Sequence, residues 1–184
     1  PDPWVLDVAE WRATGNGTWR NLAPLPLARN QLSVAVLNDK IYVVAGQLNH
    51  DSQQIDQDGV DIYDPASDTW ADGPSLPYGH SHSEGATFVH DNRIWMVAGH
   101  TTPHGGKKGF CGNVVSLGEG EEWELTCKAP KPMSSPASKV IKGRLYVAGG
   151  WDGRMTEETP DRNYWADRQI SSPEVWVTDL PDRT

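Results

Sequence analysis

The histidines are the side chains best suited to chemistry in this sequence. His80, His82 and Glu84 alternate along one short segment, so an extended backbone would turn all three toward the same side. Imidazole and carboxylate groups together suit zinc, copper or iron, and His100 is a further imidazole that follows a strand-like run. If a metal is bound, we expect His80, His82 and His100 to be its ligands. A His-x-His pair has no fixed meaning on its own, however, and the sequence indicates no other cofactor.

A β-strand pattern that would position these histidines occurs three times along the chain. Residues 41–46, 94–99 and 145–150 are apolar runs that contain an aromatic residue and end in glycine, and they start 53 and 51 residues apart. A polar turn and another short strand precede each run, which predicts a hairpin. Outer strands are marked by Trp19, Trp70 and Trp123, which stand 51 and 53 residues apart. Each tryptophan is followed by a proline-rich inter-blade connection, at residues 22–31, 73–84 and 129–136.

These residues resemble the kelch repeat. That family has a period of about 50 residues, an aromatic strand ending in Gly-Gly, a Tyr-Asp-Pro step and a tryptophan that opens the outer strand. The sequence departs from the pattern in two ways. Only Gly149-Gly150 keeps both glycines, because the other units carry Gly46-Gln47 and Gly99-His100, and the third unit lacks an outer-strand tryptophan.

The resemblance implies an all-β, kelch-type β-propeller with about three four-stranded antiparallel blades plus partial strands. A β-sandwich with coincidental periodicity is the alternative. We expect a partial blade at 1–23, blades at 24–73 and 74–128, and a blade at 129–184 that lacks a clear outer strand. Since propellers close with four to eight blades, the ring is incomplete within these residues. Either the remainder of a longer propeller or a second chain is expected to complete it.

Strands that alternate in direction bring the longest connections to one face, which we call the long-loop face. It holds residues 47–59, 100–113 and 151–173 together with the inter-blade connections. Binding residues usually lie on such loops, although long loops are also tolerated as mere insertions. The side chains expected there form a pocket for a small polar or sugar-like ligand, or else cap strand ends. They are Arg29, Asn30, Gln47, His80, His82, Glu84, His100, His104, Trp151, Asp152 and Arg154.

Two features indicate a secreted or extracytoplasmic protein. Cys111 and Cys127 bracket the loop 118–120. If those three residues form the whole loop, the two cysteines lie directly opposite each other, within reach of a disulfide. Free thiols are the alternative, and they are typical of a cytosolic protein. Asn16-Gly17-Thr18 is an acceptor pattern for N-glycosylation, which makes Asn16 a candidate site.

Charge and motifs narrow the function classes. Lys plus Arg is 16 and Asp plus Glu is 25, a net charge of -9, which argues against a nucleic-acid partner. No apolar run approaches the roughly 20 residues of a membrane helix. No established catalytic motif is present. We therefore expect a non-catalytic binding or scaffold module that presents its long-loop face to a protein or a glycan.

A sugar-acting enzyme is the alternative function. The kelch-like propellers that this chain resembles include copper-radical oxidases and mutarotases of sialic acid. A mutarotase needs an acid–base pair near a sugar, and Arg29, His82 and Glu84 would serve. A third possibility is a purely structural part of a larger assembly.

Overall fold

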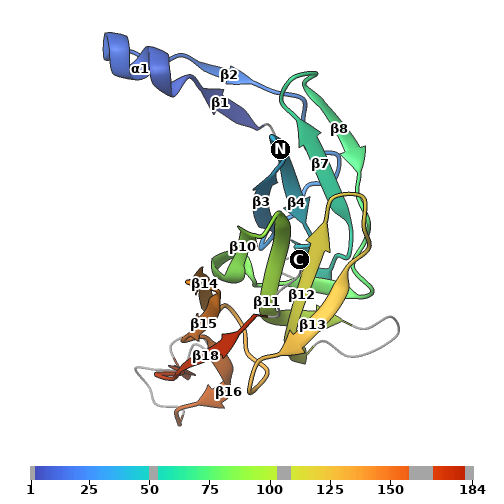
Figure 1. Cartoon of the computed structure of the whole chain (residues 1–184), viewed down its shortest axis with the longest axis vertical. Helices are drawn as coiled ribbons and strands as arrows, with labels where there is room; N and C mark the ends of the chain where they lie inside the picture. The colour runs from blue at the N-terminus through green and yellow to red at the C-terminus, as the bar shows by residue number, and fades with distance from the viewer. Residues whose placement is uncertain (1–2, 50–53, 103–108, 158–167, 181–184) are drawn as a thin grey trace.

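Figure 1 shows the computed structural model of the chain, which describes residues 3–49, 54–102, 109–157 and 168–180. The described elements are nearly all strands, arranged in antiparallel sheets that follow one another in chain order. The predicted all-β fold of four-stranded antiparallel blades is confirmed. Within the described residues, no helix has both the length and the apolar character needed to cross a bilayer.

The first blade pairs its four strands in chain order: β3 (Ser33–Leu37), β4 (Lys40–Val44), β7 (Val60–Asp64) and β8 (Thr69–Asp72). Burial alternates along β3, where Val34 and Val36 are exposed between buried neighbours. Asn38 and Asp39 turn β3 into β4 with φ of 50° and 59°. Both torsions are left-handed, as a two-residue type I′ hairpin requires. The polar turns at 91–92 and 142–143 share this geometry, so the predicted hairpins are confirmed in all three blades.

The second blade has longer inner strands. It consists of β10 (Thr87–His90), β11 (Arg93–Thr102), β12 (Gly109–Gly118) and β13 (Glu124–Lys128). The far end of β11 also pairs with β9 (Gly79–Ser81), which belongs to the inter-blade connection. A single 3-10 turn, η1 (Glu84–Ala86), leads from β9 into β10.

The third blade has three strands in the described part of the chain, β14 (Ala137–Ile141), β15 (Arg144–Ala148) and β18 (Val175–Asp179). Two small ribbons lie on the long-loop side of the blades. One joins β5 (Gln47–Leu48) to β6 (Ile55–Asp56), and the other joins β16 (Trp151–Met155) to β17 (Gln169–Ser171). The long connections therefore carry secondary structure of their own.

The N-terminal segment is a two-stranded ribbon interrupted by a helix. The strands β1 (Trp4–Leu6) and β2 (Trp19–Asn21) pair, and α1 (Val8–Thr14) lies between them. The sequence predicts only a turn there. Asp7 caps α1 by accepting a hydrogen bond from the Glu10 backbone N–H, and Gly15 ends it with φ of 73°. Asn16 follows the helix and is exposed. In Figure 1 this ribbon projects away from the blades.

Two apolar clusters hold the blades together. The first lies between the first and second blades, where Leu37 and Val44 meet Ile94 and Leu117. The second lies between the second and third blades, where side chains such as Trp95 and Val114 meet Leu145 and Val147. Each cluster draws on both of its flanking blades, so neighbouring blades are packed as one body rather than strung on a linker.

The predicted disulfide is wrong. Cys127 on β13 lies opposite Val114 and not opposite Cys111, and both thiols are free. A bulge between Val114 and Val115 shifts the register, and the loop after β12 is longer than three residues. The residues that lengthen it make contacts elsewhere. Glu121 is bonded to Arg93, and the Nε1–H of Trp123 donates to the Pro74 carbonyl at 2.9 Å.

Candidate functional site

The long-loop face is built on one backbone feature that recurs in each blade. Where the second strand ends, two successive residues have positive φ: 58° and 107° at Ala45-Gly46, 56° and 116° at Ala98-Gly99, and 70° and 86° at Gly149-Gly150. The glycine common to all three blades is therefore the second of the pair. The sequence comparison had placed the departure one residue too late, because Ala45 and Ala98 replace the first glycine.

The shared glycine lets the inter-blade connection cross the strand closely. A Cβ atom would lie 2.8 Å from the Asn30 carbonyl oxygen at Gly46, 2.5 Å from that of Ser81 at Gly99, and 2.9 Å from that of Ser134 at Gly150. These distances are too short for any side chain. The next residue in each blade then pairs with the connection, through Asn30↔Gln47, Ser81↔His100 and Ser134↔Trp151. Gln47, His100 and Trp151 thus occupy equivalent positions.

The connections are also bonded to one another across blades. Gln31, His82 and Ser135 each have positive φ, between 50° and 60°. The His82 N–H donates to the Gln31 carbonyl at 3.4 Å, and the Ser135 N–H donates to the His82 carbonyl at 2.9 Å. Successive blades therefore present these three residues next to one another on the long-loop face.

A buried carboxylate links the first two blades beneath this face. Asp56 on β6 accepts hydrogen bonds from Gln47 Nε2 at 3.0 Å, from Ser81 Oγ at 2.8 Å and from Thr102 Oγ1 at 2.7 Å. Gln47 is only 1% exposed, and its Oε1 has no hydrogen-bond partner in the described structure. Because each donor comes from a different segment, the carboxylate fixes the position of one blade against the next.

His80 is buried in the same region and is held neutral. Its Nε2 lies 2.7 Å from the Ala98 carbonyl oxygen and 2.8 Å from Ser83 Oγ. A proton on Nε2 satisfies the carbonyl, which leaves Nδ1 as a buried acceptor without a partner among the described atoms. Burial lowers the pKa of His80 to about 4, although the Ala98 carbonyl and Asp56 act in the opposite direction.

Arg29 is a structural cation rather than a surface group. It forms an ion pair with Asp61 at 2.6 Å, and its side chain is 1% exposed. The guanidinium also donates to the carbonyls of Ala45 and Val43, near the end of β4. The planar group thereby ties the first inter-blade connection to two strands of the first blade.

Four rings form a continuous row on the long-loop face, which we call the aromatic row: His82, His100, Phe110 and Trp151. His82 stacks on His100 with centroids 4.0 Å apart, His100 meets Phe110 at 5.0 Å, and Phe110 meets Trp151 edge-on at 5.1 Å. All four side chains are half-buried. The row runs from the second blade to the third and leaves part of each ring open to a ligand.

A charged cluster flanks the row at the third blade and consists of Lys131, Asp152, Arg154 and Glu174. Asp152 is paired with Lys131 and with Arg154, each at 2.9 Å, and Lys131 also binds Glu174. Hydrogen bonds from Arg154 and then Lys131 hold the pKa of Asp152 well below its usual range. The Trp151 indole N–H donates to the Arg154 carbonyl at 2.7 Å, which joins the cluster to the row.

The structure sorts the predicted site residues into three groups. Arg29, Gln47 and His80 lie beneath the face, where they support it. His82, His100, Trp151, Asp152 and Arg154 lie on it. Asn30 and Glu84 are exposed at its edge, where Asn30 is held by backbone pairing and Glu84 begins η1. His104 lies outside the described residues.

The expected one-sided arrangement of His80, His82 and Glu84 is wrong. The backbone turns at His82, where φ is 60°, so the segment is not extended beyond β9. His80 points into the interior, whereas His82 stacks on His100. In the part of the chain that the structure describes, no group of three or more His, Cys, Asp or Glu side chains is arranged to hold a metal ion.

Three residues of the site were not predicted: Asp56, Phe110 and Lys131. Phe110 is one of only two phenylalanines and follows a long connection, which is a usable signal. Lys131 lies in an inter-blade connection, where only the polar residues near the next strand were considered. Asp56 carries no local pattern, because its donors come from residues 47, 81 and 102.

Comparisons with known proteins agree with this architecture. Residues 28–77 match the family model described as Kelch motif. Kelch-like protein terF of Aspergillus terreus is 32% identical over 138 residues, which covers 73% of this chain and 30% of that protein. Kelch repeat and BTB domain-containing protein 12 of Homo sapiens is 26% identical over 172 residues, covering 86% of this chain and 26% of that protein. The chain therefore spans less than a third of either relative.

The fold itself matches a solved structure. That of YjhT superposes with a TM-score of 0.73 at 16% sequence identity, over 97% of this chain and 56% of the other. At that identity the match concerns the fold alone.

Proposed function

Because the chain belongs to the kelch-repeat proteins, we propose that it is a binding module that engages a protein partner through the aromatic row on its long-loop face. The observation that carries this proposal is the row itself: four half-buried rings in contact, contributed by two blades. Aromatic side chains that are rigidly held and partly open are the usual anchors of protein interfaces.

The surroundings of the row support the same use. Its rings are fixed by the backbone pairing of His100 and Trp151 to the inter-blade connections, so little conformational entropy is lost on binding. The charged cluster supplies a polar rim beside the apolar centre, which is the common anatomy of a protein interface. A protein partner would therefore contact the rings first and the ion pairs at the margin.

A glycan ligand and a sugar-acting enzyme remain predictions. Of the acid–base residues suggested for a mutarotase, Arg29 is committed to Asp61, while Glu84 and His82 lie on different sides of the turn that follows β9. Extracytoplasmic location also remains a prediction, and it now depends on the Asn16 acceptor pattern alone, since the cysteines are free. We further propose that additional blades complete the ring.

Capture of partners from an extract of the source organism, followed by binding measurements with the purified partner, tests the proposal. We expect Phe110→Ala and Trp151→Ala to weaken binding by at least about tenfold, as for interface anchors. Trp4→Ala is the matched control, since Trp4 is an exposed aromatic residue on the N-terminal ribbon. A partner that binds the Phe110→Ala and Trp151→Ala variants as tightly as the unaltered chain would exclude the aromatic row as its binding site.

A further inference from the structure

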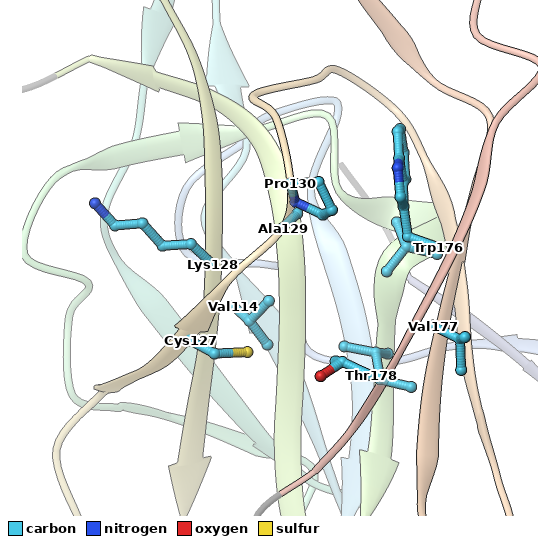
Figure 2. Close-up of a pocket in the computed structure, with 10 residues that line it drawn as sticks. Val114, Cys127, Lys128, Ala129, Pro130, Trp176, Val177 and Thr178 are labelled. Carbon is cyan, nitrogen blue, oxygen red and sulfur yellow. The ribbon is translucent and has the colours of Figure 1, made fainter.

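An apolar pocket of about 260 Å³ opens between the second and third blades, away from the aromatic row (Figure 2). Its walls come from Val114 and Cys127 of the second blade and from Trp176 and Thr178 of β18, and the connection at Ala129 and Pro130 closes it. Small-molecule sites usually measure about 300–1,000 Å³. This pocket is below that range and suits one large side chain.

The other blades show what fills the equivalent place. In the second blade, Trp123 packs against the apolar cluster between blades one and two, and its indole N–H donates to the Pro74 carbonyl at 2.9 Å. In the first blade, the Trp70 indole N–H donates to the Ala23 carbonyl at 2.8 Å. Both tryptophans come from the outer-strand side of a blade, and both bind the inter-blade connection that precedes it.

The third blade has the connection without the tryptophan. Ala129 and Pro130 correspond to Gly73 and Pro74 one unit earlier, and both line the pocket. In the described residues β18 pairs only with β15, so its other edge carries no strand. Val175 and Val177 on that strand are 65% and 45% exposed. An open strand edge beside an apolar pocket is the arrangement that accepts an added strand.

One outer-strand tryptophan in this chain has the opposite deficiency. Trp19 on β2 continues the spacing of Trp70 and Trp123, but it is 58% exposed and lies on the projecting ribbon. The ribbon pairs through only three residue pairs, from Trp4↔Asn21 to Leu6↔Trp19. The chain thus holds an outer strand without a blade and a blade without an outer strand.

We propose that β2 of a second copy adds to the free edge of β18, with its Trp19 in the pocket and its indole N–H bonded to a carbonyl of the Ala129–Pro130 connection. β1 holds the edge of β2 that a third strand holds in a complete blade, so β1 gives way to β18 in this exchange. The five residues of β18 replace the three of β1. Exchange of an identical element between copies is a low-energy route to dimers.

The chain direction agrees with this junction. β2 leads through an inter-blade connection into β3, as β8 leads toward β10 and β13 toward β14. The first blade of the second copy would then stand next to the third blade of the first copy. Two such junctions close a ring with three blades from each copy, and a total of six is within the four to eight of known propellers.

The mass of the 184-residue chain in solution, measured by sedimentation equilibrium from about 1 to 100 µM, tests the proposal. We expect a dimer of the 20.3 kDa chain. Trp19→Ala should weaken dimerisation by at least about tenfold, because a buried tryptophan anchor is lost. Trp11→Ala is the matched control, since Trp11 on α1 is 50% exposed and outside the junction, and should leave dimerisation unchanged.

The reactivity of Cys127 provides a second readout. In a Cys111→Ser background, maleimide labelling of Cys127 should slow as dimer forms, and Trp19→Ala should restore the rate. A chain that is monomeric throughout, a dimer that Trp19→Ala leaves intact, or labelling that ignores concentration would each overturn the exchange. The inference does not rest on partner binding by the long-loop face, and Phe110→Ala should leave the dimer unaffected.

Discussion

Acidification should destabilise this protein through His80. The ring is 1% exposed, and burial lowers its pKa to about 4 from an ordinary value of 6.5. Between these values the unfolded chain takes up a proton at this residue and the folded chain does not. The free energy of unfolding therefore falls as the pH drops from 6.5 toward 4, and the contribution is fully present above pH 6.5.

The magnitude follows from the shift. One pKa unit corresponds to about 1.4 kcal/mol, so a displacement of about 2.5 units is worth about 3 kcal/mol of stability. Single domains have only about 5–15 kcal/mol in total. Protonation of this one side chain therefore removes a large fraction of the stability, and it acts where the first two blades meet around Asp56.

Urea unfolding followed by tryptophan fluorescence, at about pH 7.5, 6.5, 5.5 and 4.5, measures the effect. His80→Gln keeps a side-chain N–H that can donate to the Ala98 carbonyl but does not titrate, so its stability should fall less with acid than that of the unaltered chain. His90→Gln removes a half-exposed imidazole on β10 and controls for the loss of any histidine. Parallel curves of stability against pH for the unaltered chain and His80→Gln would refute the reasoning.

Three further predictions concern other parts of the scaffold. Arg29→Met should lower the free energy of unfolding by about 3–5 kcal/mol in the same urea assay, because it leaves the Asp61 carboxylate buried without its partner; a loss below about 1 kcal/mol would show that the pair is not structural. Gly99→Ala should lower it by about 3 kcal/mol, since φ is 116° and a Cβ would lie 2.5 Å from the Ser81 oxygen. Gly59→Ala is its control, as nothing lies within 4 Å of that Cβ, and equal losses would contradict the crossing geometry. Thiol titration of the unfolded, unreduced protein should count two free cysteines, whereas a count of zero would restore the disulfide.

The blades could be predicted from the sequence because their signals are local. Each inner hairpin combines an apolar run with a two-residue turn whose side chains tolerate left-handed torsions, such as Asn38-Asp39. The helix α1 was missed although Asp7 and Gly15 mark its two ends, since seven residues contain too few turns for a clear period. The ribbon β5–β6 was missed for a similar reason, because two-residue strands have no alternation to detect.

The register of β12 and β13 could not be predicted, because contacts distant in the sequence set it. Glu121 reaches Arg93 on a neighbouring strand, and Trp123 reaches the Pro74 carbonyl in another blade. These contacts lengthen the loop beyond the assumed three residues, so Cys127 moves away from Cys111. Likewise, only the assembled fold reveals that Arg29 and His80 are buried, since polar residues in a connection read as surface groups in a sequence.

The equivalent positions on the long-loop face show where binding specificity resides. Gly46, Gly99 and Gly150 are fixed by the close crossing of the connections, so the backbone beyond them is the same in each blade. The next residue is free of that constraint and differs each time: Gln47 turns inward to Asp56, whereas His100 and Trp151 join the aromatic row. The same backbone therefore serves anchoring in the first blade and contact in the other two. A partner that uses the aromatic row should accordingly bind over the second and third blades, with the first blade holding them in place.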